Sequence, residues 1–166
     1  MPAGLEIERK YLVDHNWMQQ LTTEKIVMKY NLAQGYLNTD PSHTVRVRLN
    51  SSTNTAYLTI KGLRTGISCP EFEYQIPYDE ADQLLDMCQY VILKTRYVVQ
   101  VHALTWEVDV FLGNHDGLII AEIELESKDV IVPTPSWVGT EVSTDNRYTN
   151  LYLAKMPQYN PALFEE

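Results

Sequence analysis

Polar and apolar residues alternate with a period of two along most of this 166-residue chain. Because successive side chains of a strand point to opposite faces, this alternation predicts strands with one charged and one apolar face. Turn-forming residues, such as those of Asp40-Pro41-Ser42, separate the alternating segments. The strands predicted in this way cover residues 5–13, 26–38, 44–50, 55–61, 69–76, 92–101, 103–111 and 118–127.

Three segments show helical spacing instead. Asp79 is a suitable N-cap for a helix that runs to about residue 89. Asp14 begins a short helix that places Trp17 and Leu21 on one face, and a last helix is capped by Asp145. The inward face of the longest helix is predicted to carry Ala81, Leu84, Leu85 and Cys88.

The order of these segments predicts the fold. Short connections favour antiparallel pairing, because a parallel crossover needs a dozen or more residues. Eight antiparallel strands can close into a barrel with room for a small ligand. We therefore expect residues 1–166 to form a single, mainly β (α+β) domain, an eight-stranded antiparallel closed barrel with a few flanking helices.

The composition narrows the set of partners. The chain is 45% hydrophobic, and its formal net charge of −9 makes it a poor candidate for binding nucleic acid or anionic lipid. It has no apolar run of 18 residues, and we expect no signal peptide, because residues 1–10 are already charged and strand-like. Cys69 and Cys88 indicate reduced thiols. We expect a cytoplasmic protein that binds a small molecule, no nucleic acid and no membrane; the sequence leaves open whether it forms a homodimer.

The charged faces are sorted by sign, strand by strand. Glu6, Glu8 and Lys10 stand in one row about 6–7 Å apart, and Arg46 and Arg48 form another. On a single strand, a row exposed to solvent is the simpler interpretation. Like charges two residues apart repel, however, whereas rows of opposite sign attract across a lumen, so we predict that the charged faces point inward. This lumen set comprises Lys10, Arg46, Arg48, Lys61, Lys94, Arg96, Glu6, Glu8, Glu71, Glu73, Glu107, Asp109, Glu122, Glu124 and Glu126.

These side chains predict a particular chemistry. Carboxylates without histidine or cysteine partners suit Mg²⁺ or Mn²⁺ rather than Zn²⁺. Arginine and lysine suit phosphate oxygens. Carboxylates, a divalent metal and guanidinium groups are together the components of phosphoryl transfer. The four histidines, which include His115, have unrelated contexts and are interpreted as solvent or loop residues.

The motif Glu6-x-Glu8-x-Lys10 resembles the signature of the triphosphate tunnel metalloenzymes, the CYTH superfamily. Among its members, the chain is most similar to the short bacterial inorganic triphosphatases. The resemblance extends over nearly the whole chain. Further blocks follow in family order: Gln34-Gly35-Tyr36-Leu37, Val45-Arg46-Val47-Arg48, Thr59-Ile60-Lys61-Gly62, Glu71-Phe72-Glu73, Lys94-Thr95-Arg96-Tyr97, Trp106-Glu107-Val108-Asp109-Val110-Phe111, Ala121-Glu122-Ile123-Glu124-Leu125 and Gly139-Thr140-Glu141-Val142.

The resemblance implies a tunnel that binds a triphosphate with two divalent ions, Mg²⁺ or Mn²⁺. Lys94 and Glu8 are the implied catalytic residues, with Lys94 stabilising developing charge or assisting the attacking water. Glu71, Glu107 and Glu126 are interpreted as rim residues in salt bridges. The implied metal ligands are Glu6, Glu8, Glu73, Asp109, Glu122 and Glu124, and the implied phosphate-binding residues are Lys10, Arg46, Arg48, Lys61, Lys94 and Arg96.

The same resemblance implies hydrolysis of inorganic tripolyphosphate to pyrophosphate and phosphate. Three alternatives stay open at this point. They are a thiamine or nucleoside triphosphatase, a class IV adenylyl cyclase, and a polyphosphate-binding module without activity. A cyclase needs a nucleobase pocket, and no stretch of the sequence clearly supplies one. A pure phosphate binder would not need so many metal ligands.

Overall fold

The computed structural model describes residues 4–22 and 24–161. Within them, nine strands form one antiparallel sheet in the order β5-β4-β3-β2-β6-β7-β8-β1-β9. An additional pairing between β5 and β1 closes β1 to β8 into a barrel, which confirms the predicted architecture. The strands are β1 Leu5–Val13, β2 Lys25–Asn38, β3 His43–Asn50, β4 Thr55–Gly62, β5 Ser68–Ile76, β6 Val91–Val101, β7 Leu104–Phe111, β8 Ile119–Glu124 and β9 Val138–Glu141.

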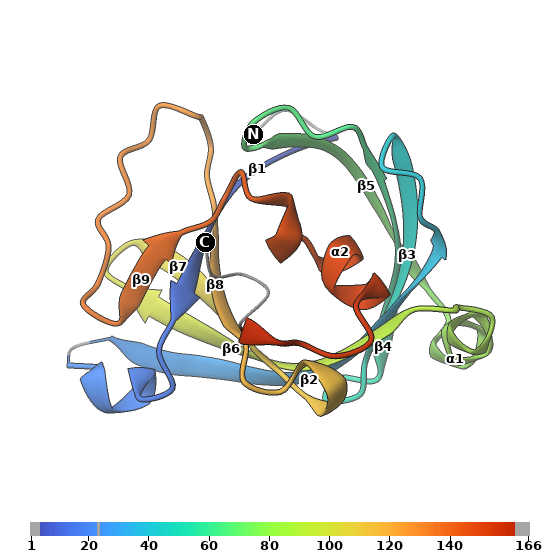
Figure 1. Ribbon diagram of the computed structural model, residues 1–166, viewed down its shortest axis with the longest axis horizontal. Coiled ribbons are helices and arrows are strands. Elements are labelled where there is room, and N and C mark those ends of the chain that lie inside the picture. Colours follow the sequence, from blue (N-terminus) through green and yellow to red (C-terminus); the bar gives the residue numbers. More distant parts are fainter. Residues whose placement is uncertain (1–3, 23, 162–166) are drawn as a thin grey trace.

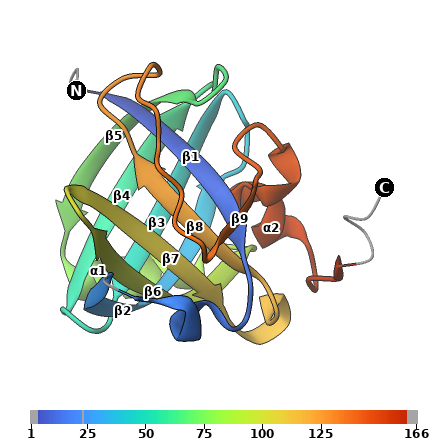
Figure 2. The same ribbon diagram turned by 90° about the vertical axis from the view of Figure 1, so that its left-hand side faces the viewer.

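Strand β1 forms the seam of the barrel. Its first residues pair with β5, its middle pairs with β8, and its end pairs with β9 outside the ring. Strand β9 was not predicted, because it has only four residues and follows a proline-containing loop. Figure 1 looks into the ring of strands, and together with Figure 2 it places α2 (Asn150–Lys155) over one mouth of the barrel.

Several predicted boundaries need correction. Helix α1 (Tyr78–Asp86) has Pro77, not Asp79, at its N-cap, and it ends before residue 89. Asp79 instead lies in the first turn, where a carboxylate interacts favourably with the helix dipole. The predicted first helix is a short 3-10 turn, η1 (Trp17–Gln20), which begins after Asn16.

Two further boundaries concern the end of the chain. Strand β8 stops at Glu124, so the predicted lumen residue Glu126 lies beyond it and is exposed. Asp145 does act as a cap, because its carboxylate accepts a hydrogen bond from the backbone N–H of Arg147. It caps a 3-10 turn, η3 (Asn146–Tyr148), whereas Thr149 caps α2.

The apolar faces of the strands point outward, as predicted. The largest outer cluster, here called the tryptophan cluster, contains Trp17, Trp106 and Trp137. The ring centroids of Trp17 and Trp106 each lie 5.7 Å from that of Trp137, a spacing typical of tilted and edge-to-face aromatic pairs. These rings pack on the outside of β1, β7 and β8 and bury much apolar area there.

A second cluster joins α1 to β3 and β4 through Val47, Leu49, Ala56 and Ala81. The pairing of β2 with β3 shifts its register between Tyr36 and Asn38, just after Gly35. Gly35 itself has a packing role, because a Cβ atom there would lie 2.7 Å from the Cβ of Cys88 at the end of α1.

A third cluster, here called the closing cluster, packs the C-terminal segment against one end of the barrel. It combines Phe111 and Ile120 from the barrel with Tyr148 and Leu153 from the C-terminal segment. His115 lies in the connection between β7 and β8, so the loop position expected from the sequence is right, but its side chain is buried and not solvent-exposed. Its ring Nε2 donates a hydrogen bond to the Leu153 carbonyl. In the part of the chain that the structure describes, no helix is long and apolar enough to cross a bilayer.

Candidate active site

The lumen holds an inner chamber of about 220 Å³ with an unusually charged wall. Apart from Asn150 of α2, the side chains that line it come from alternate positions of the barrel strands, as the period-two pattern predicts. Carboxylates outnumber cations in this wall, so the wall carries excess negative charge. Its lining consists of Glu6, Glu8, Arg46, Arg48, Lys61, Glu71, Glu73, Arg96, Glu107, Glu122, Glu124 and Asn150.

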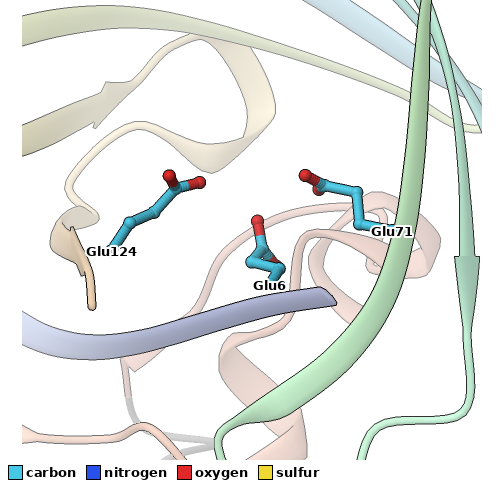
Figure 3. A group of neighbouring side chains, drawn as sticks. All are labelled: Glu6, Glu71 and Glu124. Atoms are coloured by element: carbon cyan, nitrogen blue, oxygen red, sulfur yellow. The ribbon is translucent and has the colours of Figure 1, made fainter. Parts of the chain in front are cut away.

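Three of these carboxylates, here called the acid triad, form the closest group. Oxygen atoms of Glu6, Glu71 and Glu124 all lie within 4.8 Å of one another, and Figure 3 shows them converging from separate strands. Burial and the negative charges of Glu6 and other nearby glutamates raise the pKa of Glu124 to about 7. A divalent cation would remove this repulsion.

The donor set of the acid triad fits a hard cation. Carboxylate oxygens are the ligands that Mg²⁺, Mn²⁺ and Ca²⁺ prefer, and the triad contains no soft ligand. Glu71 was expected only to form a rim salt bridge. It does form one, with its Oε2 3.4 Å from Lys61 Nζ, but it also faces Glu6 and Glu124.

The other predicted metal ligands occupy different surroundings. Glu8 and Glu122 each lie near Lys10, with oxygen to Nζ distances of 3.6 and 3.8 Å. Glu73 accepts a hydrogen bond from Thr59. Thus Glu8, Glu73 and Glu122 line the chamber around the acid triad rather than belonging to it.

Asp109 and Lys94 form a buried ion pair in the barrel wall. Lys94 Nζ lies 2.7 Å from Asp109 Oδ2, and both side chains are 0% exposed. Arg96 donates two hydrogen bonds to the same carboxylate, at 2.7 and 2.9 Å. Burial alone would raise the pKa of Asp109, but Arg96 and Lys94 hold this pKa well below its ordinary value. Burial, with Arg96 and Arg48 nearby, lowers the pKa of Lys94 to about 7.

The two arginines of β3 have donors left for an anion. Arg48 Nε donates to Gln34 Oε1 at 3.0 Å, and burial lowers the pKa of Arg48 to about 10. Arg46 Nη2 donates to Thr59, while its buried Nε has no hydrogen-bond partner. An unpartnered buried donor is costly, so a bound anion would satisfy it.

Lys61 and Arg64 contact the carboxylates of β1. Lys61 Nζ lies 2.9 Å from Glu6 Oε1, and an Arg64 nitrogen lies 3.7 Å from Glu6 and 3.6 Å from Glu8. Burial would lower the pKa of Lys61, but Glu6 and Glu8 raise it. Arg64 was missed because it lies in the loop between β4 and β5, where the alternating pattern gives no signal.

An outer chamber of about 390 Å³ adjoins the inner one. Arg46, Lys61 and Asn150 line both, so the two spaces meet at these residues. The outer wall adds Lys10, Arg64 and Lys155, and no carboxylate of the described residues lines it. The route between the mouth covered by α2 and the lumen is therefore positively charged, which favours entry of an anion.

Comparison with known proteins identifies the family. The CYTH domain model matches residues 4–157. The chain belongs to the CYTH domain family. An inorganic triphosphatase from Acetivibrio thermocellus is 43% identical over 159 residues, which cover 95% of this chain and 97% of that protein. An inorganic triphosphatase from Nitrosomonas europaea is 33% identical over 154 residues, which cover 90% of this chain and 96% of that protein.

Solved structures agree with this assignment. The crystal structure of the inorganic triphosphatase NE1496 matches this chain with a TM-score of 0.64 and 31% sequence identity. The match covers 93% of this chain and 97% of the chain in that structure. The likeness therefore extends over the whole barrel.

The structure gathers most of the predicted site around one space. Lys10 lines the outer chamber, whereas Lys94 and Asp109 line neither space. The residues that sequence reasoning missed are Arg64, Gln34 and Asn150. Gln34 shares a strand face with the chamber and could have been found by alternation, but Asn150 comes from the C-terminal segment and could not. The implied metal ligands and phosphate-binding residues that line the inner chamber are Glu6, Glu8, Arg46, Arg48, Lys61, Glu73, Arg96, Glu122 and Glu124, and the predicted rim residues Glu71 and Glu107 line it too.

Proposed function

We propose that this CYTH protein hydrolyses a triphosphate with the help of a divalent cation, and that inorganic tripolyphosphate is its preferred substrate. The observation that carries the proposal is the inner chamber, where the acid triad lies beside the cations Arg46, Arg48, Lys61 and Arg96. Two relatives named inorganic triphosphatase, each matched over nearly its full length, support it. The products would be pyrophosphate and phosphate.

The acid triad would hold a Mg²⁺ or Mn²⁺ ion. Such an ion, when bound, polarises phosphate oxygens and lowers the pKa of a bound water. Glu8, Glu73 and Glu122 line the same chamber and would complete the coordination or hold a second ion. Asp109 is the least suited member of the predicted ligand set, because Lys94 and Arg96 already occupy its carboxylate.

The cations would hold the phosphate chain. Arg46 and Arg48 present guanidinium donors that match phosphate oxygens, and Lys61 adds a point charge. Lys10 would contribute from the outer chamber. By neutralising the oxygens, these groups let a water attack the terminal phosphorus. As the new P–O bond forms, the bridging P–O bond breaks and pyrophosphate leaves.

Lys94, Arg96 and Glu8 would act on the reacting groups. Lys94 and Arg96, both fixed by Asp109, would stabilise the charge that develops on the transferred phosphoryl group. Glu8 lies in the chamber wall and would accept the proton that the water loses.

A second candidate substrate is an organic triphosphate. The outer chamber contains apolar and aromatic residues, among them Tyr36, Leu151 and Tyr152, beside its cations. An organic group attached to a triphosphate could lie there while the phosphates occupy the lumen. This arrangement keeps thiamine or nucleoside triphosphate hydrolysis open.

A phosphate-release screen tests the proposal. Purified protein is incubated with tripolyphosphate, ATP, thiamine triphosphate or pyrophosphate in the presence of Mg²⁺ or Mn²⁺, and cyclic AMP is measured in parallel. We expect tripolyphosphate to be hydrolysed fastest, with pyrophosphate accumulating. Cyclic AMP formation would favour the cyclase alternative, and tight tripolyphosphate binding without phosphate release would favour a binding module.

A further inference from the structure

Asn150 occupies an unusual position, because it lines the inner and the outer chamber although it belongs to the C-terminal segment. Its Oδ1 accepts a hydrogen bond from Lys94 Nζ at 3.2 Å. The ammonium of Lys94 is completely buried, and its other close contacts are Asp109 Oδ2 at 2.7 Å and the Phe111 ring, whose centroid lies 5.6 Å away. Asn150 is thus the neutral polar partner of this ammonium.

The backbone of α2 is held in place independently of the lumen. Thr149 accepts a hydrogen bond from Tyr152 N–H, and its carbonyl accepts one from Leu153 N–H. Leu153 is fully buried in the closing cluster, and its carbonyl accepts the hydrogen bond from His115. Asn150 is therefore presented to Lys94 by a segment that is anchored elsewhere.

We propose that Asn150 is a positioning residue that directs the Lys94 ammonium toward the substrate. With Asp109 as its only partner, the ammonium would be drawn onto that carboxylate, which Arg96 already occupies. The amide oxygen provides a second acceptor on a residue that lines the inner chamber, and it fixes the direction of a second of the three N–H groups. Because the amide is neutral, it does so without adding a negative charge that would repel the phosphate chain. The inference rests on the proposed function, since it matters only if Lys94 acts on a phosphoryl group.

Steady-state kinetics of two leucine variants test this inference. Asn150→Leu removes the acceptor with little change in size, and Asn114→Leu is the matched control, because Asn114 is an exposed asparagine that lines neither chamber. We expect Asn150→Leu to lower kcat for tripolyphosphate about 10- to 100-fold, the range for one hydrogen bond to a charged group. We expect KM to change less than about threefold, and the kcat of Asn114→Leu to stay within about twofold of that of wild type.

A rescue and a double-mutant cycle separate positioning from a structural role. Asn150→Gln keeps an amide next to the spacious outer chamber and should recover at least part of kcat. In a Lys94→Ala background, measured with excess enzyme, adding Asn150→Leu should lower the rate of hydrolysis by less than about twofold further, because the effects of coupled residues are not additive. If the rate losses of the two single variants multiply in the double variant, and Asn150→Leu has a lowered melting temperature, then Asn150 merely anchors α2 and the inference is overturned.

The outcomes also distinguish this inference from the proposed function. If wild-type protein with Mg²⁺ releases no phosphate from tripolyphosphate, the proposed function fails. If wild type and Asn114→Leu are active and Asn150→Leu has the same kcat, the proposed function stands and the role of Asn150 is refuted.

Discussion

The lumen and the tryptophan cluster are built from the same strands and differ in almost every physical property. In β7, Glu107 and Asp109 face the lumen, whereas Trp106 and Val108 face outward. The lumen concentrates ionised groups that repel one another, whereas the cluster buries apolar rings. Under the proposed function, alternate residues of one strand serve binding and stability separately, so substitutions on the two faces should have separable effects.

The comparison also explains how a barrel can tolerate such an interior. Buried ions cost several kcal/mol each unless they are paired. The described lumen contains many pairs, such as Arg96 with Asp109, but the acid triad keeps an excess of carboxylates. Burial of apolar side chains outside the barrel, as in the tryptophan cluster, stabilises the fold against this cost.

The largest expected effect comes from the lumen. Glu124→Gln removes one member of the acid triad and should lower tripolyphosphate hydrolysis by about 1,000-fold or more, the upper range for loss of one electrostatic group. Its free energy of unfolding without metal should equal or exceed that of wild type, because repulsion is relieved. Phosphate release and urea denaturation measure the two quantities. A destabilised variant that keeps its activity would mean that Glu124 is a structural residue.

The opposite behaviour is expected for the tryptophan cluster. Trp106→Ala removes a fully buried ring and should lower the free energy of unfolding by about 3–5 kcal/mol. The indole N–H of Trp106 has no hydrogen-bond partner, so the loss would be one of packing. At a temperature where the variant is folded, its kcat should stay within about threefold of wild type. A kcat as low as that of Glu124→Gln would show that the two faces are not independent.

A somewhat smaller effect on the rate of hydrolysis is expected at the proposed phosphate-binding arginines. Arg48→Ala should raise the activation barrier for tripolyphosphate hydrolysis by about 2–4 kcal/mol, as for one lost oxyanion donor. Arg48→Lys should recover only part of the rate, because the fork of two donors is lost. A wild-type rate for the alanine variant would show that Arg48 does not contact the substrate.

The smallest effect concerns pH. The pKa of Glu124 is raised from its ordinary value near 4.5 to about 7, so the folded protein keeps a proton that the unfolded chain releases over this interval. The free energy of unfolding should therefore fall as the pH rises from about 4.5 to 7. Urea denaturation in EDTA should show a steeper fall for wild type than for Glu124→Gln. Parallel slopes would contradict the crowding of the acid triad.

Hydrolysis should depend on pH in the opposite direction. A triad carboxylate binds metal only when it is deprotonated, so the rate should increase from about pH 6 to 8 as Glu124 loses its proton. Initial rates at one fixed, subsaturating Mg²⁺ concentration check this expectation, because saturating metal would displace the proton at every pH. A maximum near pH 5 would be inconsistent with it.

The barrel and most of its charged lining could be predicted from the sequence because both follow from the period of two. Glu6, Arg48 and Glu122 face the lumen for that reason alone. Where strands end, the pattern gives no information: Glu126 was assigned to the lumen although β8 stops two residues earlier, and Arg64 was missed in a loop.

Contacts between distant segments could not be predicted for another reason. Asn150 reaches Lys94 across 56 residues because the closing cluster fixes α2 at the mouth of the barrel. The grouping of Glu71 with Glu6 and Glu124 likewise depends on how β1 pairs with both β5 and β8. Such information lies in three-dimensional packing and not in any local pattern.

Metal dependence tests the central claim most directly. Protein stripped with EDTA is assayed for phosphate release from tripolyphosphate while Mg²⁺ or Mn²⁺ is added back in steps. The lumen described above predicts no hydrolysis in chelator and a saturable return of activity with added metal, which Glu124→Gln should not show at the same concentrations. Full activity in EDTA would contradict the assignment of the acid triad as a metal site and, with it, the proposed mechanism.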